Sequence, residues 1–244
     1  HFGTLDPKVT GVLPVALGRA CKLTGFFLGH DKEYVGIMYT HKEQDIKKLQ
    51  KIINKNFIGK IKQMPPVKSR VKRAVREREV KRFELLEQGE NKKKFLFVAE
   101  VEGGTYIRKL CSDLGDMIGG AHMLELRRVR AGIFSEKDNL INLNKFTEAV
   151  NEFKAGGKDN EEKLRKMLIP AEDAIKKIMP IVQVKKTALK QLLTGKPLFK
   201  KDIAGEIPEE DIFSVFHKDK FIEIVEKTNE KGEDIMAKAL FVFN

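Results

Sequence analysis

Apolar and polar residues follow two different periods in the first half of the chain. They alternate through residues 32–41, which is the period of a half-buried strand. Residues 44–57 instead carry apolar side chains three and four positions apart, which predicts one face of a helix. The same two patterns predict strands over residues 80–87, 95–102 and 123–130, and a helix over residues 105–118 with Thr105 as its N-terminal cap.

The pattern changes after Pro180, where apolar residues gather in short runs typical of strands. These runs cover residues 180–184, 212–216, 221–225 and 235–243, and one short helix is predicted over residues 187–193, ending at Gly195. Short strands of this kind favour a small β-barrel. The chain is therefore predicted to be α+β, with a mixed, mainly antiparallel sheet domain over residues 1–169 and a barrel over residues 170–244.

The charge is distributed unevenly between these two parts. The formal net charge is +12, yet residues 170–244 contain 13 Lys and Arg and 13 Asp and Glu. The whole excess therefore lies before Pro170, which favours binding of a polyanion by the first domain. A generally Lys-rich composition is the alternative explanation.

The sequence shows no pattern for a metal site, a disulfide framework, a nucleotide loop or a membrane span. Cys21 and Cys111 are not part of a Cys-x-x-Cys pair, and no histidine cluster accompanies them. Neither a Gly-x-x-x-x-Gly-Lys-Ser/Thr loop nor a Gly-x-Gly-x-x-Gly motif after a strand is present. No apolar run approaches the roughly 20 residues of a spanning helix. We therefore expect no metal, no cofactor and no membrane partner.

Asp6 is the strongest candidate for chemistry. It precedes Pro7, which holds its backbone extended, and Gly3 and Gly11 allow the chain to turn tightly on either side. A carboxylate presented on a rigid loop can act as a nucleophile or a general base. The alternative is an aspartate that only braces its own turn.

Several arginines are candidates for anion contacts. Arg108 lies in the first turn of the predicted helix and could pair with a carboxylate, although a solvated surface position is the common alternative. On the strand around residue 127, Arg128 and Arg130 point to one face with Leu126, and Arg127 points to the other. Arginines on such a strand suit phosphate contacts, whereas Leu126 alone would be read as core.

Five segments together resemble the motifs of one family. They are GTLDPKVTGVLPVAL (3–17), Lys32-Glu33-Tyr34, PPVKSRVKR (65–73), GTYIRKLCSDLG (104–115) and LRRVRAG (126–132). All five resemble, in the same order, motifs of the TruB superfamily of pseudouridine synthases, which unites bacterial tRNA enzymes with archaeal and eukaryotic dyskerin-type enzymes. The residues after the PP segment and the residues around Lys8 resemble the dyskerin branch. The segment from about Pro180 resembles a PUA domain, an RNA-binding β-barrel.

The resemblance implies a reaction and a set of roles. It implies that the chain isomerises uridine to pseudouridine in RNA, with Asp6 as the catalytic carboxylate. Arg108 would pair with Asp6, Tyr34 would stack on the flipped base, and Leu126 would close the pocket. Backbone contacts to RNA are expected from Lys8, Lys68, Arg70, Lys72, Arg73, Arg76, Arg127, Arg128 and Arg130.

The resemblance also implies partners. It favours an H/ACA ribonucleoprotein in which a guide RNA selects a uridine, most simply in rRNA, with small protein partners. This enzyme would be cytoplasmic in an archaeon and nucleolar in a eukaryote. A stand-alone tRNA pseudouridine synthase and a non-catalytic RNA-binding scaffold are the alternatives.

One departure from the family concerns the start of the chain. The family places a strand and a helix before the catalytic motif, whereas this chain begins inside that motif at His1. We expect a separate N-terminal polypeptide to supply the missing part, unless the chain has been trimmed. On this hypothesis the chain expressed alone is poorly folded or inactive.

Overall fold

The computed structural model describes residues 1–65, 74–138, 140–156, 158–228 and 234–243. These residues form two compact units. The first unit consists of His1–Ala16 and Thr24–Leu140, and the second consists of Leu17–Leu23 and Ile141–Asn244. Each unit is described by itself.

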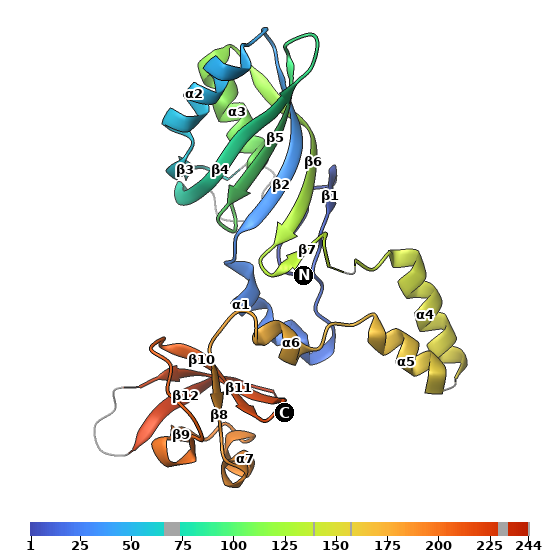
Figure 1. Ribbon diagram of the computed structural model, residues 1–244, viewed down its shortest axis with the longest axis vertical. Coiled ribbons are helices and arrows are strands. Elements are labelled where there is room, and N and C mark those ends of the chain that lie inside the picture. The colour runs from blue at the N-terminus through green and yellow to red at the C-terminus, as the bar shows by residue number, and fades with distance from the viewer. Residues whose placement is uncertain (66–73, 139, 157, 229–233, 244) are drawn as a thin grey trace. The chain divides into compact units, whose positions relative to one another are not determined.

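The first unit is built on a seven-stranded sheet in the order β1-β6-β2-β5-β4-β3, with β7 paired to β6 (Figure 1). Only the β1–β6 pair is parallel, so the prediction of a mixed, mainly antiparallel sheet is confirmed. The strands that alternation predicted are present as β2, β4, β5 and β6. The seven strands are β1 (Val9–Gly11), β2 (Lys32–Thr40), β3 (Gly59–Gln63), β4 (Arg76–Gln88), β5 (Lys94–Val101), β6 (Ala121–Ala131) and β7 (Phe134–Ser135).

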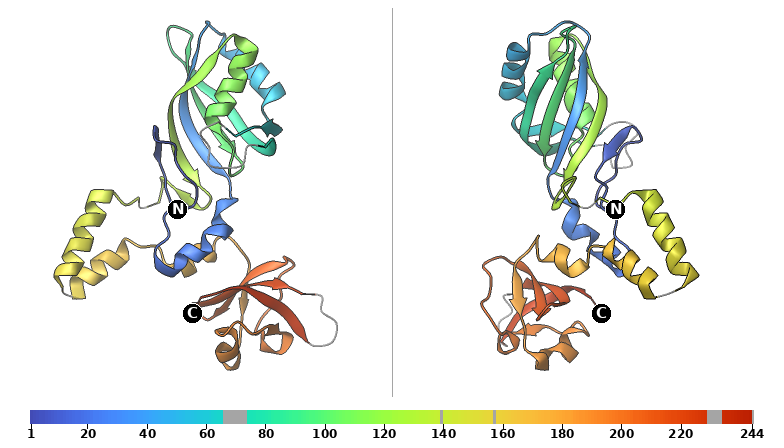
Figure 2. Two further views of the ribbon diagram at one scale, coloured as in Figure 1. Left: turned by 180° about the vertical axis from the view of Figure 1, so that it is seen from behind. Right: turned by 45° about the vertical axis from the view of Figure 1, so that its right-hand side comes forward.

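Two helices, α2 (Ile46–Asn56) and α3 (Ile107–Ile118), pack on one face of this sheet (Figures 1 and 2). Their apolar faces share one core with the sheet, in which Leu49 and Leu110 lie with Met38 and Phe97. The helical period in the sequence is thus the stripe that meets the sheet. The Asp45 side chain caps α2 by accepting a hydrogen bond from the Lys48 amide at 2.9 Å.

The start of α3 differs from the prediction. The helix begins at Ile107, and the Thr105 hydroxyl donates to the Glu102 carbonyl instead of capping the helix. The Tyr106 amide donates to the Gln63 side chain on β3 at 3.0 Å. A residue from a neighbouring strand therefore takes the place that local sequence assigned to Thr105.

The chain enters the sheet through short elements. After β1, a 3-10 helix (Gly18–Leu23) and the short helix α1 (Thr24–Leu28) lead to β2. At the very start, the Phe2 ring stacks on Phe27 at 4.7 Å and lies 5.9 Å from Phe134. This aromatic cluster anchors the N-terminal segment in the first unit.

The second unit contains a five-stranded sheet in the order β8-β10-β11-β12-β9, and the four predicted runs are confirmed as β8, β10, β11 and β12. The β8–β10 pair is parallel and the other pairs are antiparallel. Its core includes Val182, Phe213, Ile222 and Val225. The strands are β8 (Ile181–Gln183), β9 (Leu198–Phe199), β10 (Ile212–His217), β11 (Lys220–Lys227) and β12 (Ile235–Val242).

The helices of the second unit either precede β8 in the sequence or lie between the strands of this sheet. The predicted short helix is observed as a 3-10 turn (Lys186–Ala188) followed by α7 (Leu189–Leu192), and Gly195 follows it with a φ of 77°. Three helices that precede the sheet in the sequence were not predicted. They are α4 (Leu143–Ala155), α5 (Lys158–Lys166) and α6 (Ala171–Ile175). A 3-10 turn at Lys200–Asp202 follows β9.

The two units meet in sequence at residues 140 and 141, earlier than the predicted boundary between residues 169 and 170. Helices α4 and α5 are grouped with the second sheet by this division, so the functional boundary stays a prediction. Within the described part of the chain, no helix is long and apolar enough to cross a membrane.

Candidate active site

Asp6 and Arg108 form an ion pair between side chains that lie 102 positions apart in the sequence. Asp6 is presented by the loop before β1, and Arg108 by the first turn of α3. The predicted pairing of these two residues is confirmed. The side chains are 47% and 54% exposed, so the carboxylate is open to a large ligand rather than enclosed.

The loop that carries Asp6 is fixed on both sides. The Phe2 amide donates to the Pro14 carbonyl at 3.0 Å, and the Val9 amide donates to the carbonyl of Asp6 itself at 2.8 Å. Strand β1 then pairs in parallel with β6, with Val9 opposite Leu126. The carboxylate is therefore held on a braced turn, as a preorganised reactive group requires.

Gly11 makes this pairing possible at close range. Its φ is 100°, a value that residues with a Cβ rarely adopt, and a Cβ there would clash with the Arg128 carbonyl oxygen. The Val12 amide donates to that same carbonyl at 2.8 Å. The glycine of the sequence motif thus permits the close approach of the Asp6 loop to β6.

The structure corrects the RNA contact predicted for Arg128. Its side chain is only 1% exposed, so it cannot reach a phosphate at the surface. The guanidinium donates from Nε to the Val12 carbonyl at 2.7 Å and from a terminal nitrogen to the Gly3 carbonyl at 3.1 Å. Strand alternation placed this arginine on the correct face, but that face is turned into the protein.

Tyr34 lies on β2 directly opposite Arg128 on β6. Its side chain packs partly on the core. Burial raises the pKa of Tyr34, whereas the charge of Arg128 lowers it and the charge of Asp6 raises it. The charges of Asp6 and Arg128 therefore both act on the Tyr34 phenol. Tyr34 lies near the residues with which the sequence grouped it.

Leu126 is 7% exposed and belongs to the core of the first unit. It pairs with Val9 on β1 and with Gly36 on β2, and a Cβ at Gly36 would lie 2.8 Å from its Cδ1. Its position next to β1 places it near the Asp6 loop. Its role as a pocket wall stays a prediction.

The other predicted RNA contacts occupy different environments. Lys8 is exposed and Arg76 is half-buried at the start of β4. Arg127 is exposed and pairs with Glu136, whereas Arg130 is paired with Glu100 at 2.6 Å and with Glu33 at 3.5 Å. Lys68, Arg70, Lys72 and Arg73 lie outside the described residues.

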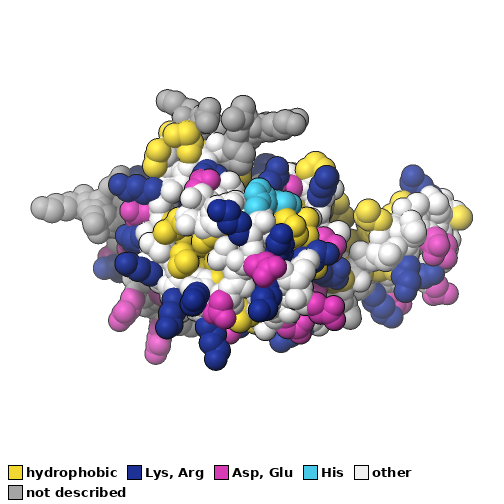
Figure 3. All heavy atoms as spheres, turned by 90° about the horizontal axis from the view of Figure 1, so that it is seen from above, with side chains coloured by type: hydrophobic (Ala, Val, Ile, Leu, Met, Phe, Trp, Pro, Cys, Tyr) yellow, Lys and Arg dark blue, Asp and Glu magenta, His cyan; other side chains and the backbone are white. Residues whose placement is uncertain are grey.

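The basic side chains of the described residues form no continuous patch on the face seen in Figure 3. On the face of the first unit seen in Figure 3, Lys and Arg side chains lie among Asp and Glu side chains. Histidines gather there too, and His41 Nε2 lies 3.3 Å from His122 Nδ1. Contacts to RNA backbone therefore stay predictions for individual residues.

Two buried polar residues near the site were missed by sequence reasoning. Lys32 is 4% exposed, and its ammonium donates to the Leu28 carbonyl at 2.7 Å and to the His30 carbonyl. Burial lowers the pKa of Lys32, and so does the charge of Arg128. Gln63 braces the start of α3 and thereby the helix that carries Arg108. A lysine two residues before the candidate tyrosine is the one signal that could have drawn attention to Lys32.

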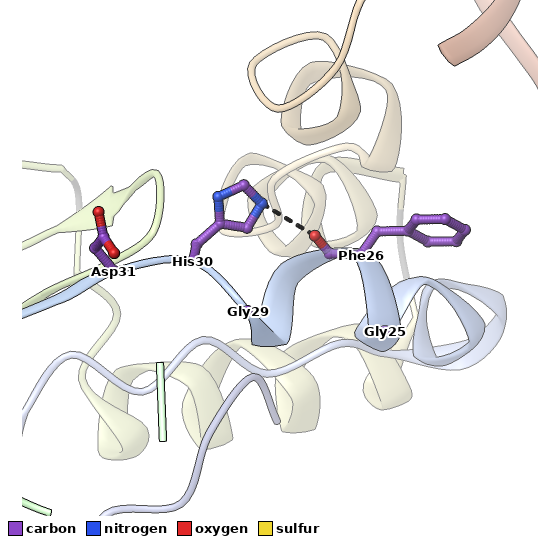
Figure 4. Close-up of a pocket in the computed structure, with 5 residues that line it drawn as sticks. All are labelled: Gly25, Phe26, Gly29, His30 and Asp31. Carbon is purple, nitrogen blue, oxygen red and sulfur yellow. Dashed lines mark hydrogen bonds between the residues drawn. The ribbon is translucent and has the colours of Figure 1, made fainter. Parts of the chain in front are cut away.

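A pocket of about 370 Å³ lies at the turn between α1 and β2, lined by Gly25, Phe26, Gly29, His30 and Asp31 (Figure 4). The His30 ring is hydrogen-bonded to the Phe26 carbonyl at 3.0 Å, and Asp31 forms an ion pair with Lys81. Its lining does not include Asp6. This pocket is therefore separate from the Asp6–Arg108 pair.

The groups that could hold a metal or act as a reactive thiol give no competing site. Among the described residues, no three His, Cys, Asp or Glu side chains gather in a metal-binding group. Cys111 is fully buried, and burial raises the pKa of its thiol to about 12. The Asp6–Arg108 pair with Tyr34 beside it is the arrangement that can support chemistry.

Two models of known families match successive parts of the chain. Residues 1–107 match the model of the TruB family pseudouridylate synthase N-terminal domain, and residues 108–176 match the tRNA pseudouridylate synthase B C-terminal domain. The first match contains Asp6 and Tyr34, and the second contains Arg108 and Leu126.

Curated relatives and solved structures point the same way. The chain is 46% identical over 206 residues to a probable tRNA pseudouridine synthase B of Korarchaeum cryptofilum, covering 84% of this chain and 61% of the relative. A relative of the same name from Methanocaldococcus jannaschii is 41% identical over 205 residues, 84% of this chain and 59% of the relative. The chain thus spans about three fifths of the length of these two relatives.

A chain in the crystal structure of a Cbf5–Nop10–Gar1 complex superposes with a TM-score of 0.84 and 36% identity, covering 100% of this chain and 76% of that one. A chain in an H/ACA ribonucleoprotein bound to a substrate RNA containing 2′-deoxyuridine gives a TM-score of 0.82 and 35% identity, covering 99% and 75%. The predicted fold class is confirmed by these likenesses.

Proposed function

Because this chain belongs to the TruB family of pseudouridylate synthases, we propose that it isomerises uridine to pseudouridine in RNA with the carboxylate of Asp6. The observation that carries the proposal is the ion pair between Asp6 and Arg108. It joins two of the motifs on which the family resemblance rests, and it leaves the carboxylate accessible.

Arg108 orients the carboxylate of Asp6 and places a positive charge beside it. A guanidinium paired with a carboxylate fixes the orientation of the two oxygens. An exposed pair of this kind contributes little to folding stability, about 0–1 kcal/mol. Its value lies in geometry and charge at the reacting centre.

The target nucleotide must leave its stack to reach Asp6. The extruded uracil would stack on the Tyr34 ring, a contact worth about 1–3 kcal/mol per base. Asp6 then assists cleavage of the bond between C1′ and N1. The detached uracil rotates, C1′ bonds to C5, and the proton on C5 is lost while N1 regains one. Atoms and electrons balance within the substrate, so the reaction needs no oxidant, reductant or second substrate.

Asp6→Asn tests this proposal directly. Substrate transcripts are incubated with the native protein or the variant, and pseudouridine is quantified by mass spectrometry of the digested RNA. We expect product with the native protein and none with Asp6→Asn, at nearly equal RNA affinity. Asp113→Asn is the matched control, since it removes another carboxylate from an ion pair in the first unit. Product from Asp6→Asn at the native rate would overturn the assignment of Asp6.

We also propose that a guide RNA and small protein partners direct this activity, with rRNA as the substrate. The likeness to chains solved in H/ACA and Cbf5–Nop10 assemblies supports this proposal. The five-stranded sheet of the second unit would act as the PUA-type RNA-binding module. The names of the curated relatives favour the alternative, a tRNA pseudouridine synthase that acts alone.

An assay with two substrates separates these possibilities. Product on tRNA transcript without guide would favour the stand-alone enzyme, whereas product that requires guide RNA and partner proteins would support the guided one. RNA binding without product under either condition, in the presence of all partners, would identify a non-catalytic scaffold.

A further inference from the structure

Arg128 is a buried charge whose position calls for a physical explanation. It is the largest of the fully buried side chains, and the described residues provide it with no carboxylate within ion-pair distance. Removing a guanidinium from water without an ionic partner costs several kcal/mol unless its hydrogen bonds are replaced. Backbone carbonyls therefore take the place of water around this guanidinium.

The contacts of Arg128 bracket the catalytic loop. Nε donates to the carbonyl of Val12 at 2.7 Å, and a terminal nitrogen donates to the carbonyl of Gly3 at 3.1 Å. Asp6 lies between these two carbonyls in the sequence. One rigid guanidinium thus ties the entry of the loop to its exit, a geometry that a lysine ammonium cannot reproduce.

The backbone of Arg128 adds a third connection to the same loop. Its carbonyl accepts from the Val12 amide at 2.8 Å, and Gly11 lies opposite Arg128 in the parallel pair of β1 and β6. Figure 2 shows β1 lying along the edge of β6. The loop is therefore held by both the side chain and the main chain of one residue.

Arg128 also acts on the other side of the site. Arg128 lies directly opposite Tyr34 in the pair of β2 and β6, and its charge lowers the pKa of that phenol against the opposing effect of burial. Lys32, a second buried cation, lies behind the loop, with its Cε 3.8 Å from the place of a Cβ on Gly3. Two cations thus underlie the segment that presents the Asp6 carboxylate.

We propose that Arg128 is a positioning residue, which sets the Asp6 loop and the Tyr34 ring relative to each other through one buried guanidinium. The kinetic part of this inference rests on the proposed function, since it assigns Arg128 to the same site. Arg128 touches neither the base nor the sugar. Its effect on the reaction is therefore a displacement of Asp6 and Tyr34, which affects turnover rather than RNA affinity.

The test uses Arg128→Lys and Arg128→Ala in the protein purified with its natural partners. Arg128→Lys keeps the positive charge but loses the planar guanidinium that donates to two carbonyls. Arg128→Ala leaves a cavity that ethylguanidinium can enter. Thr40→Val is the matched control, since it removes a buried hydroxyl with carbonyl partners at the other end of β2. Amide hydrogen exchange at Val9 and Val12, RNA affinity and single-turnover pseudouridine formation are measured for each variant.

We expect both Arg128 variants to exchange faster at Val9 and Val12 than the native protein and the control. Turnover should fall roughly 100-fold, as for a displacement of about 1 Å of a catalytic group. RNA affinity should stay within about twofold of the native value, and ethylguanidinium should restore part of the turnover of Arg128→Ala. If Arg128→Ala does not fold, the comparison uses Arg128→Lys, the native protein and the control.

Three results would overturn the proposal. They are native turnover in Arg128→Lys, unchanged exchange at Val12, and a loss that lies in RNA affinity with turnover preserved. The last result would restore the phosphate contact predicted from the sequence. If the native protein makes no pseudouridine under any condition, the proposed function fails, and hydrogen exchange still decides whether Arg128 fixes the loop.

Discussion

Tyr34 on β2 and Arg128 on β6 lie directly opposite each other, and the charge of Arg128 lowers the pKa of the Tyr34 phenol against the effect of burial. The same arginine holds the backbone on both sides of Asp6. Tyr34 and the Asp6 loop thus both lie against one buried side chain, that of Arg128. This arrangement suits a reaction in which a base must be held while its bond to the sugar is broken and remade.

The ring and the hydroxyl of Tyr34 should be separable by substitution. Tyr34→Phe keeps the aromatic ring and removes the hydroxyl on which the charge of Arg128 acts, so we expect RNA affinity near the native value and slower turnover. Tyr34→Ala should also weaken binding of the extruded base, by about 1–3 kcal/mol. Affinity measured by filter binding and turnover measured in single-turnover experiments test both. Equal turnover in Tyr34→Phe and the native protein would exclude a role for the hydroxyl.

The direction of the Tyr34 pKa shift predicts the alkaline behaviour of the enzyme. Because burial dominates and raises the pKa of Tyr34 above its usual value near 10, the phenol stays protonated through neutral and moderately alkaline pH. Native turnover should therefore show no alkaline decline caused by this group below about pH 10. A decline at lower pH that disappears in Tyr34→Phe would contradict the shift.

Arg108 should affect catalysis far more than folding. Arg108→Met removes the partner of Asp6 while the half-exposed side chain leaves little buried area behind. We expect a melting temperature close to native, since exposed ion pairs contribute about 0–1 kcal/mol, together with a loss of turnover of 100-fold or more, roughly. Calorimetry and the pseudouridine assay measure the two effects. Arg165→Met, which removes an exposed helical ion pair in the second unit, is the control for loss of surface charge.

Gly11→Ala should loosen the catalytic loop. The positive φ and the clash with the Arg128 carbonyl require β1 to move away from β6. Strain of this kind costs on the order of 1–3 kcal/mol, so unfolding free energy and turnover should both fall. Gly25→Ala is the matched control, because a Cβ at Gly25 meets open space and its φ is not positive. Comparable losses in the two variants would show that the close approach at Gly11 is unimportant.

Much of this architecture was accessible from the sequence, because local periodicity reports which face of an element is buried. The alternating run that became β2 and the helical run that became α2 have a single apolar face, and that face meets the core. The pairing of Asp6 with Arg108 came from the resemblance of whole motifs. Spacing alone cannot bring together two residues 102 positions apart.

The errors arose where tertiary contacts decide. An RNA contact was predicted for Arg128 because arginines on a strand suit phosphate contacts, but here two backbone carbonyls replace water around the guanidinium. Thr105 lost its capping role to Gln63, which lies on a strand 43 positions away from the amide that it caps. Helix α4 did carry a local signal, since the Asn142 side chain caps its start and Gly156 follows its end.

Glu223 on β11 predicts an unusual pH dependence of stability in the second unit. It is fully buried, and neither carboxyl oxygen has a hydrogen-bond partner among the described residues. Burial raises its pKa to about 8, whereas an unfolded glutamate titrates near 4.3, roughly. Between these values the folded state retains a proton that the unfolded state has lost, so its stabilising effect is complete below the unfolded pKa and disappears as pH rises through 8.

Glu223→Gln removes this ionisation and should therefore gain stability relative to the native protein as pH rises. We expect the two proteins to unfold alike near pH 4 and to differ by about 5 kcal/mol above pH 8, in favour of the variant. Urea unfolding followed on the second unit at several pH values measures the difference. Glu226→Gln, which removes an exposed carboxylate three positions along the same strand, controls for net charge. A difference between Glu223→Gln and native that stays constant with pH would mean that Glu223 is solvated in solution.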